Sequence, residues 1–163
     1  MKLFVGFLIA LIAAAAPVSA QDKPALDLTE FFSGRTRGEG ILKVTLRRPA
    51  RHVVNSVGRR GSDGEFILVD TIKEEGKPVK TRRWVMRPSG RNGFTGTLSD
   101  AVGPVRVEIN GAKATIRYKM KEGGVSIHQV LTMRDRKTLS NVVTGRKLGM
   151  RVAHLEGTIR KLD

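Results

Sequence analysis

The sequence predicts an all-β fold: an up-and-down antiparallel barrel, or a strongly rolled half-barrel, of about eight to ten strands after a short N-terminal helix. Apolar and basic side chains alternate over residues 112–121, which is typical of a strand with one buried face. Asn110-Gly111 separates this stretch from the alternating residues 105–109, and Asn-Gly strongly favours a two-residue hairpin turn. Successive hairpins leave two sheet edges exposed unless the sheet closes, so a barrel is favoured.

Further turn signals, rich in glycine, asparagine, aspartate and proline, divide the rest of the chain into short alternating segments. They occur at residues 62–64, 75–78, 92–93, 123–124 and 135–137. The stretch 34–40, which contains three glycines, is interpreted as a bend before the first strand. The expected strands lie near 40–48, 51–58, 65–73, 79–87, 93–97, 103–109, 112–120, 125–134, 138–145 and 150–160.

A short helix is expected before the strands. Asp27 is a suitable N-cap residue. Leu28, Phe31 and Phe32 follow at the i, i+3, i+4 spacing of one helical face. We expect this helix to cover one end of the domain.

Residues 1–20 have the pattern of a signal peptide. Lys2 precedes an apolar run, and Pro17-Val18-Ser19-Ala20 follows it, so cleavage after Ala20 is predicted. The alternative, a membrane anchor, needs ~20 apolar residues, and the run here has about 14. The chain has no cysteine and so cannot be a lipoprotein. We therefore expect a periplasmic or secreted protein with a linker at 21–26 and a single domain at 27–163.

The chain is strongly basic. It has 30 Lys and Arg against 15 Asp and Glu, a net charge of +15. Such a surface attracts polyanions, including anionic membrane surfaces; the plain alternative is a solvated basic surface that keeps the protein soluble. Specific nucleic-acid binding is not expected, because few aromatic residues accompany the basic ones.

No catalytic motif is evident. His52, His128 and His154 fall on three separate predicted strands, and no Gly-x-Ser-x-Gly or phosphate-loop pattern occurs. Neither a cofactor nor a metal site is predicted. Asp70 is the most notable carboxylate, because it shares a face with apolar residues and needs an arginine partner there. An enzyme using Asp70 or His154 is the minor alternative, and it requires both side chains to face one cavity.

Other candidate carboxylates are Asp100 and Asp135. Four further residues are expected on inward faces, where a barrel would hold a small ligand. They are Trp84, Tyr118, Gln129 and Asn141. Arg83 and Arg117 are expected to supply positive charge for that ligand. The alternatives are a core role for the two aromatic residues and a role at a β-bulge for the two amides.

A series of short motifs resembles a known family. They are Leu28-x-x-Phe31-Phe32-x-Gly34, Arg83-Trp84, Gly93-Phe94-Thr95-Gly96, Asp100-x-Val102-Gly103, Arg117-Tyr118, Asp135-Arg136, Asn141, Lys147-x-Gly149 and Gly157-x-Ile159-x-Lys161. Their order resembles that of an uncharacterised envelope protein family of Gram-negative bacteria, a domain of unknown function. The resemblance implies a lipocalin-like barrel outside the cytoplasm. The family pattern has a second large aromatic residue upstream of Asp135, where this chain has Val130-Leu131-Thr132-Met133.

Taken together, the residues and the resemblance predict an exported, lipocalin-like protein that binds an apolar or amphipathic anionic ligand in the cell envelope. The alternative is a non-enzymatic adaptor with a filled barrel, whose basic exterior docks on anionic lipid or on a protein partner. The identity of the ligand and the oligomeric state are left open by the sequence.

Overall fold

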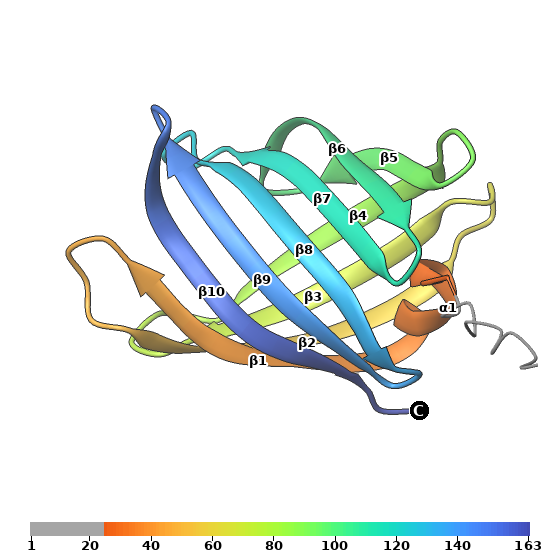
Figure 1. Ribbon diagram of the computed structural model, residues 1–163, viewed down its shortest axis with the longest axis horizontal. Coiled ribbons are helices and arrows are strands. Elements are labelled where there is room, and N and C mark those ends of the chain that lie inside the picture. The colour runs from red at the N-terminus through yellow and green to blue at the C-terminus, as the bar shows by residue number, and fades with distance from the viewer. Residues whose placement is uncertain (1–24) are drawn as a thin grey trace, which may run out of the picture.

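The computed structural model describes residues 25–163, which form a closed ten-stranded antiparallel barrel with one short helix (Figure 1). The predicted signal peptide and most of the predicted linker lie outside the described residues. Each strand pairs with its neighbours in sequence, and β1 pairs with β10 to close the barrel. The elements are α1 (Leu28–Phe32), β1 (Gly34–Val44), β2 (Ala50–Arg60), β3 (Phe66–Glu74), β4 (Lys80–Pro88), β5 (Gly93–Leu98), β6 (Ala101–Asn110), β7 (Lys113–Met120), β8 (Ser126–Asp135), β9 (Thr138–Lys147) and β10 (Met150–Lys161).

The predicted all-β barrel is confirmed, and it is fully closed. In β7 the apolar residues Ala114, Ile116 and Tyr118 are buried, whereas the basic residues of the strand, Lys113, Arg117 and Lys119, are exposed. The β6–β7 hairpin turn lies one residue beyond the predicted Asn110-Gly111: Asn110 pairs with Lys113, so the two turn residues are Gly111 and Ala112, and Gly111 has the positive φ of the first turn position. Closure removes the sheet edges, because β1 pairs along its length with both β2 and β10.

The first strand differs from the prediction at both ends. It begins at Gly34 instead of residue 40 and ends at Val44 instead of residue 48. The stretch interpreted as a bend is part of the sheet, because Thr36 is paired with Ser56 of β2 and with Lys161 of β10. These partners lie far away in the sequence, so local glycine content alone pointed to the wrong structure.

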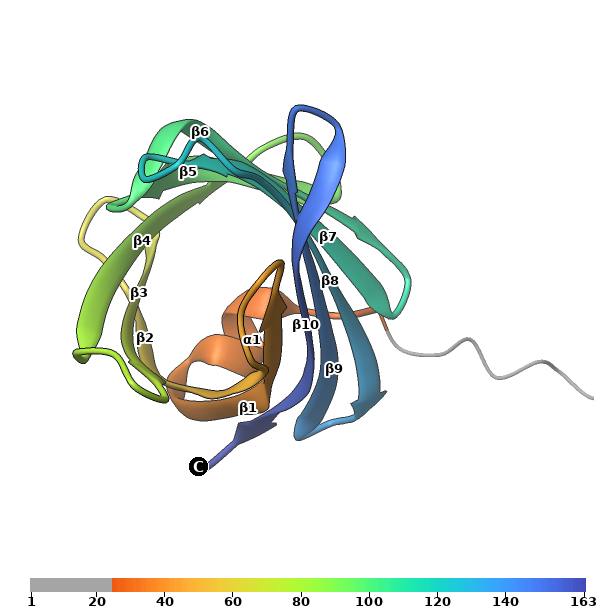
Figure 2. The same cartoon turned by 90° about the vertical axis from the view of Figure 1, so that its left-hand side faces the viewer.

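Helix α1 covers one end of the barrel, as predicted (Figure 2). The Asp27 carboxylate caps it by accepting hydrogen bonds from the backbone N–H groups of Thr29 and Glu30. At the other end of the helix, the Lys161 ammonium donates to the carbonyl oxygens of Glu30, Phe31 and Ser33. The last strand thereby fastens the helix to the barrel.

Packing also holds the helix in place. Leu28 and Phe31 are buried in the core. Gly58 of β2 lets the helix approach closely, because a Cβ atom at this position would collide with the Phe32 carbonyl oxygen. Leu26, within the predicted linker, is also buried, and its N–H group donates to the Gly111 carbonyl oxygen.

The two ends of the barrel are therefore different. We call the end covered by α1 the closed end. At the opposite, open end lie the connections at residues 45–49, 75–79, 99–100, 121–125 and 148–149, and Figure 2 looks into it. Among the described residues, no helix has the length and apolar character needed to cross a bilayer.

Candidate ligand-binding cavity

The barrel encloses a cavity of about 660 Å³. This volume is in the usual range for sites that hold a small organic molecule, about 300–1,000 Å³. Its lining at the closed end is apolar and comes from α1 and from the inward faces of several strands. That part of the lining includes Leu28, Phe32, Phe66, Leu68, Met86, Phe94, Ile116, Leu131 and Ile159.

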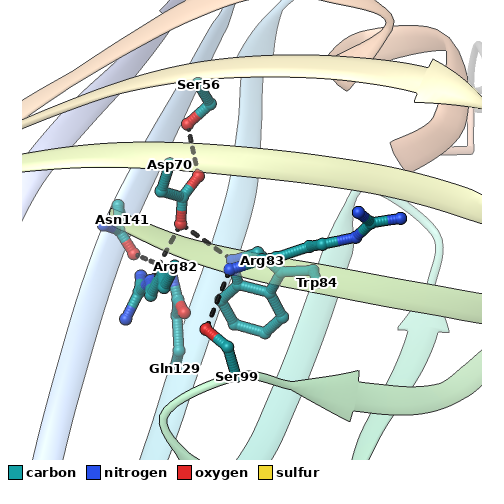
Figure 3. Close-up of polar contacts among 8 residues, drawn as sticks. All are labelled: Ser56, Asp70, Arg82, Arg83, Trp84, Ser99, Gln129 and Asn141. Atoms are coloured by element: carbon teal, nitrogen blue, oxygen red, sulfur yellow. Dashed lines mark hydrogen bonds and ion pairs between the residues drawn. The ribbon is translucent and has the colours of Figure 1, made fainter. Parts of the chain in front are cut away.

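The polar centre of the cavity wall is Asp70 of β3 (Figure 3). One carboxylate oxygen accepts a hydrogen bond from the Ser56 hydroxyl at 2.7 Å. The other accepts one from Arg82 Nε and one from Trp84 Nε1, each at 2.8 Å. The side chain of Asp70 is only 4% exposed, so the arginine partner expected for a carboxylate on an apolar face is present, and the sequence-based expectation about this residue is confirmed.

The Arg82 guanidinium lies against the Trp84 ring, with its central carbon 5.0 Å from the ring centre. Trp84 in turn packs edge-to-face against Tyr118 of β7, with ring centres 5.5 Å apart. Such a cation–π contact and aromatic pair hold the guanidinium in one orientation. Within residues 25–163, Asp70 is the only carboxylate within 4.0 Å of Arg82, and it is bound through Nε. The terminal Nη groups therefore form no second ion pair.

Three titratable groups at this wall have fixed charge states at neutral pH. Burial lowers the pKa of Arg82, but Tyr118, once it is ionised at high pH, and the Asp70 carboxylate more than offset it, so the net direction is upward and the guanidinium stays charged. Burial raises the pKa of Tyr118, which therefore stays a phenol. Burial, and next the charge of Arg82, lower the pKa of His52, which stays neutral.

His52 also carries an unmatched polar atom. It lines the cavity from β2, and its buried Nδ1 has no hydrogen-bond partner among the described residues. A buried polar atom without a partner costs free energy that a ligand group or a water molecule can recover. Nothing in the sequence distinguishes His52 from the other two histidines.

The amides Gln129 and Asn141 both line the cavity, as expected from their strand positions. Gln129 Nε2 donates to Asn141 Oδ1 at 2.8 Å, which joins β8 to β9 (Figure 3). The irregularity in this strand pair lies at Met133/Asp135, so the alternative role at a β-bulge does not apply. Each amide keeps further hydrogen-bonding groups for the interior.

The structure separates the six predicted ligand-binding residues into two sets. Trp84, Tyr118, Gln129 and Asn141 line the cavity. Arg83 and Arg117 lie on the outer surface, and Arg117 pairs there with Glu108 at 3.2 Å.

The expectation that Arg83 and Arg117 serve the same ligand as the interior residues is therefore corrected. Side chains alternate across a strand, so Arg82, two residues before Trp84, takes the inward position (Figure 3). Two features of the sequence point to Arg82: it lies two residues from Trp84, on the same face of the strand, and Asp70 needs an arginine partner on that inward face.

The other residues considered for catalysis do not converge. His154 is on the outer face, where its Nε2 lies 2.9 Å from Glu156, whereas Asp70 faces the interior. The two cannot contact one substrate atom, which was the condition for the enzyme alternative. Asp100 lies in the β5–β6 turn, and Asp135 and His128 are exposed. No cluster of three or more metal-ligating side chains occurs within residues 25–163.

The fold and the cavity define a lipocalin-like barrel, closed by a helix at one end and containing an internal pocket. The chain belongs to the family described as Protein of unknown function (DUF3833), whose sequence profile matches residues 6–161. Membership in a family of unknown function agrees with the resemblance found in the sequence. No curated protein matches the sequence.

Two solved structures share the fold. An S-type phycobiliprotein lyase, CPES, from Guillardia theta superimposes with a TM-score of 0.63 at 4% identity, over 83% of this chain and 90% of that one. A protein of unknown function from the DUF3598 family of Nostoc punctiforme gives a TM-score of 0.64 at 12% identity, over 85% of this chain and 50% of that one. At these identities the similarity shows the fold alone.

Proposed function

We propose that this protein binds one amphipathic molecule, with an apolar body and an anionic head, inside its barrel in the cell envelope. The observation that carries the proposal is the cavity of about 660 Å³, which is apolar near α1 and holds the Arg82–Trp84 pair nearer the open end. The signal-peptide pattern of residues 1–20 and the motif resemblance support the location.

The order of side chains along the strands gives the ligand an orientation. On β4 the inward residues pass from Lys80 and Arg82 near the open end to Trp84 and Met86 near α1. On β7 they pass from Tyr118 to Ile116 in the same direction. An apolar tail placed toward α1 avoids burying polar groups, and a polar head then lies near the open end.

Arg82 supports an anionic head. Its Nε is bound to Asp70, which fixes the guanidinium, and its Nη groups are the part left for a ligand. Those paired N–H donors match the two oxygens of a carboxylate or a phosphate. The net charge of +15 adds a general attraction for anions.

The competing proposal, an adaptor protein, requires a filled barrel, and the size of the cavity weighs against it. An enzymatic role is suggested only by the name of the phycobiliprotein lyase. A similarity at 4% identity carries no reaction to this chain. Asp70, the carboxylate at the polar centre of the cavity wall, is engaged by three donors.

Native mass spectrometry of protein purified without detergent from an envelope extract tests the proposal. We expect a reproducible added mass that denaturation releases as a lipid or an apolar anion. A fluorescent fatty acid then measures affinity in three variants. Arg82→Met is expected to weaken binding by about tenfold or more, and its matched control Arg83→Met is expected to leave binding unchanged.

A third variant tests the cavity without touching charge. Gly38 lines the cavity, and a Cβ atom there meets only ordinary contacts, so Gly38→Phe should fold and should lower the bound amount. Melting curves confirm that each variant is folded. A clean apo mass after incubation with envelope lipids, together with equal fatty-acid binding by the parent and Gly38→Phe, would overturn the proposal.

A further inference from the structure

Four apolar side chains stand in solvent around the open end of the barrel. Leu46 is 102% exposed and Leu148 is 91% exposed, at the tips of the β1–β2 and β9–β10 connections. Met150, two residues after Leu148, is 66% exposed, and Val79 in the β3–β4 connection is 59% exposed. We call these four residues the mouth rim. Exposed apolar groups gathered at one end of a molecule mark an interaction surface.

The backbone at two of these positions is unusual for leucine. Leu46 has a φ of 65° and Leu148 a φ of 49°, and they are the only non-glycine residues with positive φ in the described part of the chain. Glycine, asparagine or aspartate adopts this conformation at lower cost, and each would also suit a solvent-exposed turn. The stability of the fold therefore does not explain a leucine at either tip. An apolar contact with another molecule explains it.

The three connections that carry the mouth rim are neighbours around the opening (Figure 2). The β1–β2 connection meets β10 through a hydrogen bond from the Thr45 N–H group to the Val152 carbonyl oxygen at 2.9 Å. The start of β2 meets the β3–β4 connection through a bond from the Glu75 N–H group to the Arg51 carbonyl oxygen at 3.0 Å. The apolar tips thus form one arc on one side of the opening.

Positive charge flanks Leu46, Leu148 and Met150, whereas residues 74–80 around Val79 contain two glutamates and two lysines. The stretches 45–51 and 146–151 contain six basic residues and no acidic one, and all six are exposed. Five of them have no carboxylate within 4.0 Å among residues 25–163: Arg47, Arg48, Arg146, Lys147 and Arg151. Their charge is free to pair with anions outside the protein.

We propose that the mouth rim docks on an anionic phospholipid bilayer, with the open end of the barrel facing the membrane. Separate apolar tips with basic residues between them suit the headgroup layer, since leucine enters the acyl boundary while arginine and lysine contact phosphates. The proposal goes beyond ligand binding in the cavity: it concerns the outer edge of the opening and needs no internal ligand.

Co-sedimentation of the purified protein with vesicles tests the docking. The N-terminus is established by intact mass, so that every variant has the same one. We expect binding to vesicles of phosphatidylethanolamine and phosphatidylglycerol, weaker binding at high salt, and little binding to phosphatidylcholine alone. The double variant Leu46→Asn with Leu148→Asn should lower the partition constant by about tenfold or more.

The matched control removes two exposed apolar side chains from the barrel wall. Val57 and Val69 are paired on the outer face of β2 and β3, and Val57→Thr with Val69→Thr should bind vesicles as the parent does. Asparagine tolerates positive φ, so the melting temperature of the rim variant should stay level or rise. In addition, a tryptophan in Leu148→Trp should shift its emission to the blue on anionic vesicles.

Equal vesicle binding by the rim variant and the parent would overturn the proposal. So would concentration-dependent self-association that depends on Leu46 and Leu148 without vesicle binding, which would assign the mouth rim to a second copy of this chain. Fatty-acid titration in solution reports on the cavity separately, so failure of docking is distinguishable from failure of ligand binding.

Discussion

Asparagine in place of Asp70 offers a sharp test of how the cavity wall is held together. The carboxylate is 4% exposed and accepts three hydrogen bonds, one of them from Arg82, whose side chain is 16% exposed. Removal of one partner from a buried ion pair costs about 3–5 kcal/mol, because the other charge remains buried. An amide oxygen can still accept from Ser56 or Trp84, so we expect a loss of about 3 kcal/mol in the free energy of unfolding.

Urea denaturation followed by circular dichroism measures this loss against a matched control. Glu108 also pairs with an arginine, Arg117, but its side chain is 73% exposed, so Glu108→Gln should cost less than about 1 kcal/mol. The double variant Asp70→Leu with Arg82→Met removes both charges and should be more stable than Asp70→Asn. A cost for Asp70→Asn equal to that of Glu108→Gln would refute the assignment of a buried, mutually dependent pair.

Three further outcomes are expected. Burial lowers the pKa of His52 in the folded state. The neutral imidazole therefore contributes its full share of stability above its ordinary pKa of ~6.5, and this share is lost as the pH falls below that value. In His52→Gln, the melting temperature should fall less steeply than in the parent as the pH is lowered below ~6.5. Lys161→Met removes three hydrogen bonds to carbonyl groups at the end of α1 and should cost about 1–3 kcal/mol, with faster hydrogen exchange in α1 than in β7 as the local sign. Intact mass of protein from the periplasm should show an N-terminus at Gln21, and a mass that retains residues 1–20 would contradict the predicted cleavage.

Most of the strands and turns could be predicted from the amino-acid sequence. Side-chain periodicity and turn residues are local signals, and they were sufficient to place the β6–β7 hairpin turn to within one residue, the short helix after Asp27, and Gln129 and Asn141 on inward faces. The same alternation puts Arg82 and Trp84 on one face of β4 and Arg83 on the other. The sequence was therefore sufficient to predict Arg82, and not Arg83, as the inward arginine.

Features that depend on partners distant in the chain became visible only in the folded structure. The start of β1 at Gly34, the closure of β1 on β10, and the fastening of α1 by Lys161 all depend on contacts between the two ends of the domain. Local alternation determines which side chains share a face, but the partner of each is set by strand register and barrel closure. Whether the interior is filled or open follows from packing across the whole barrel, which no short stretch of sequence determines.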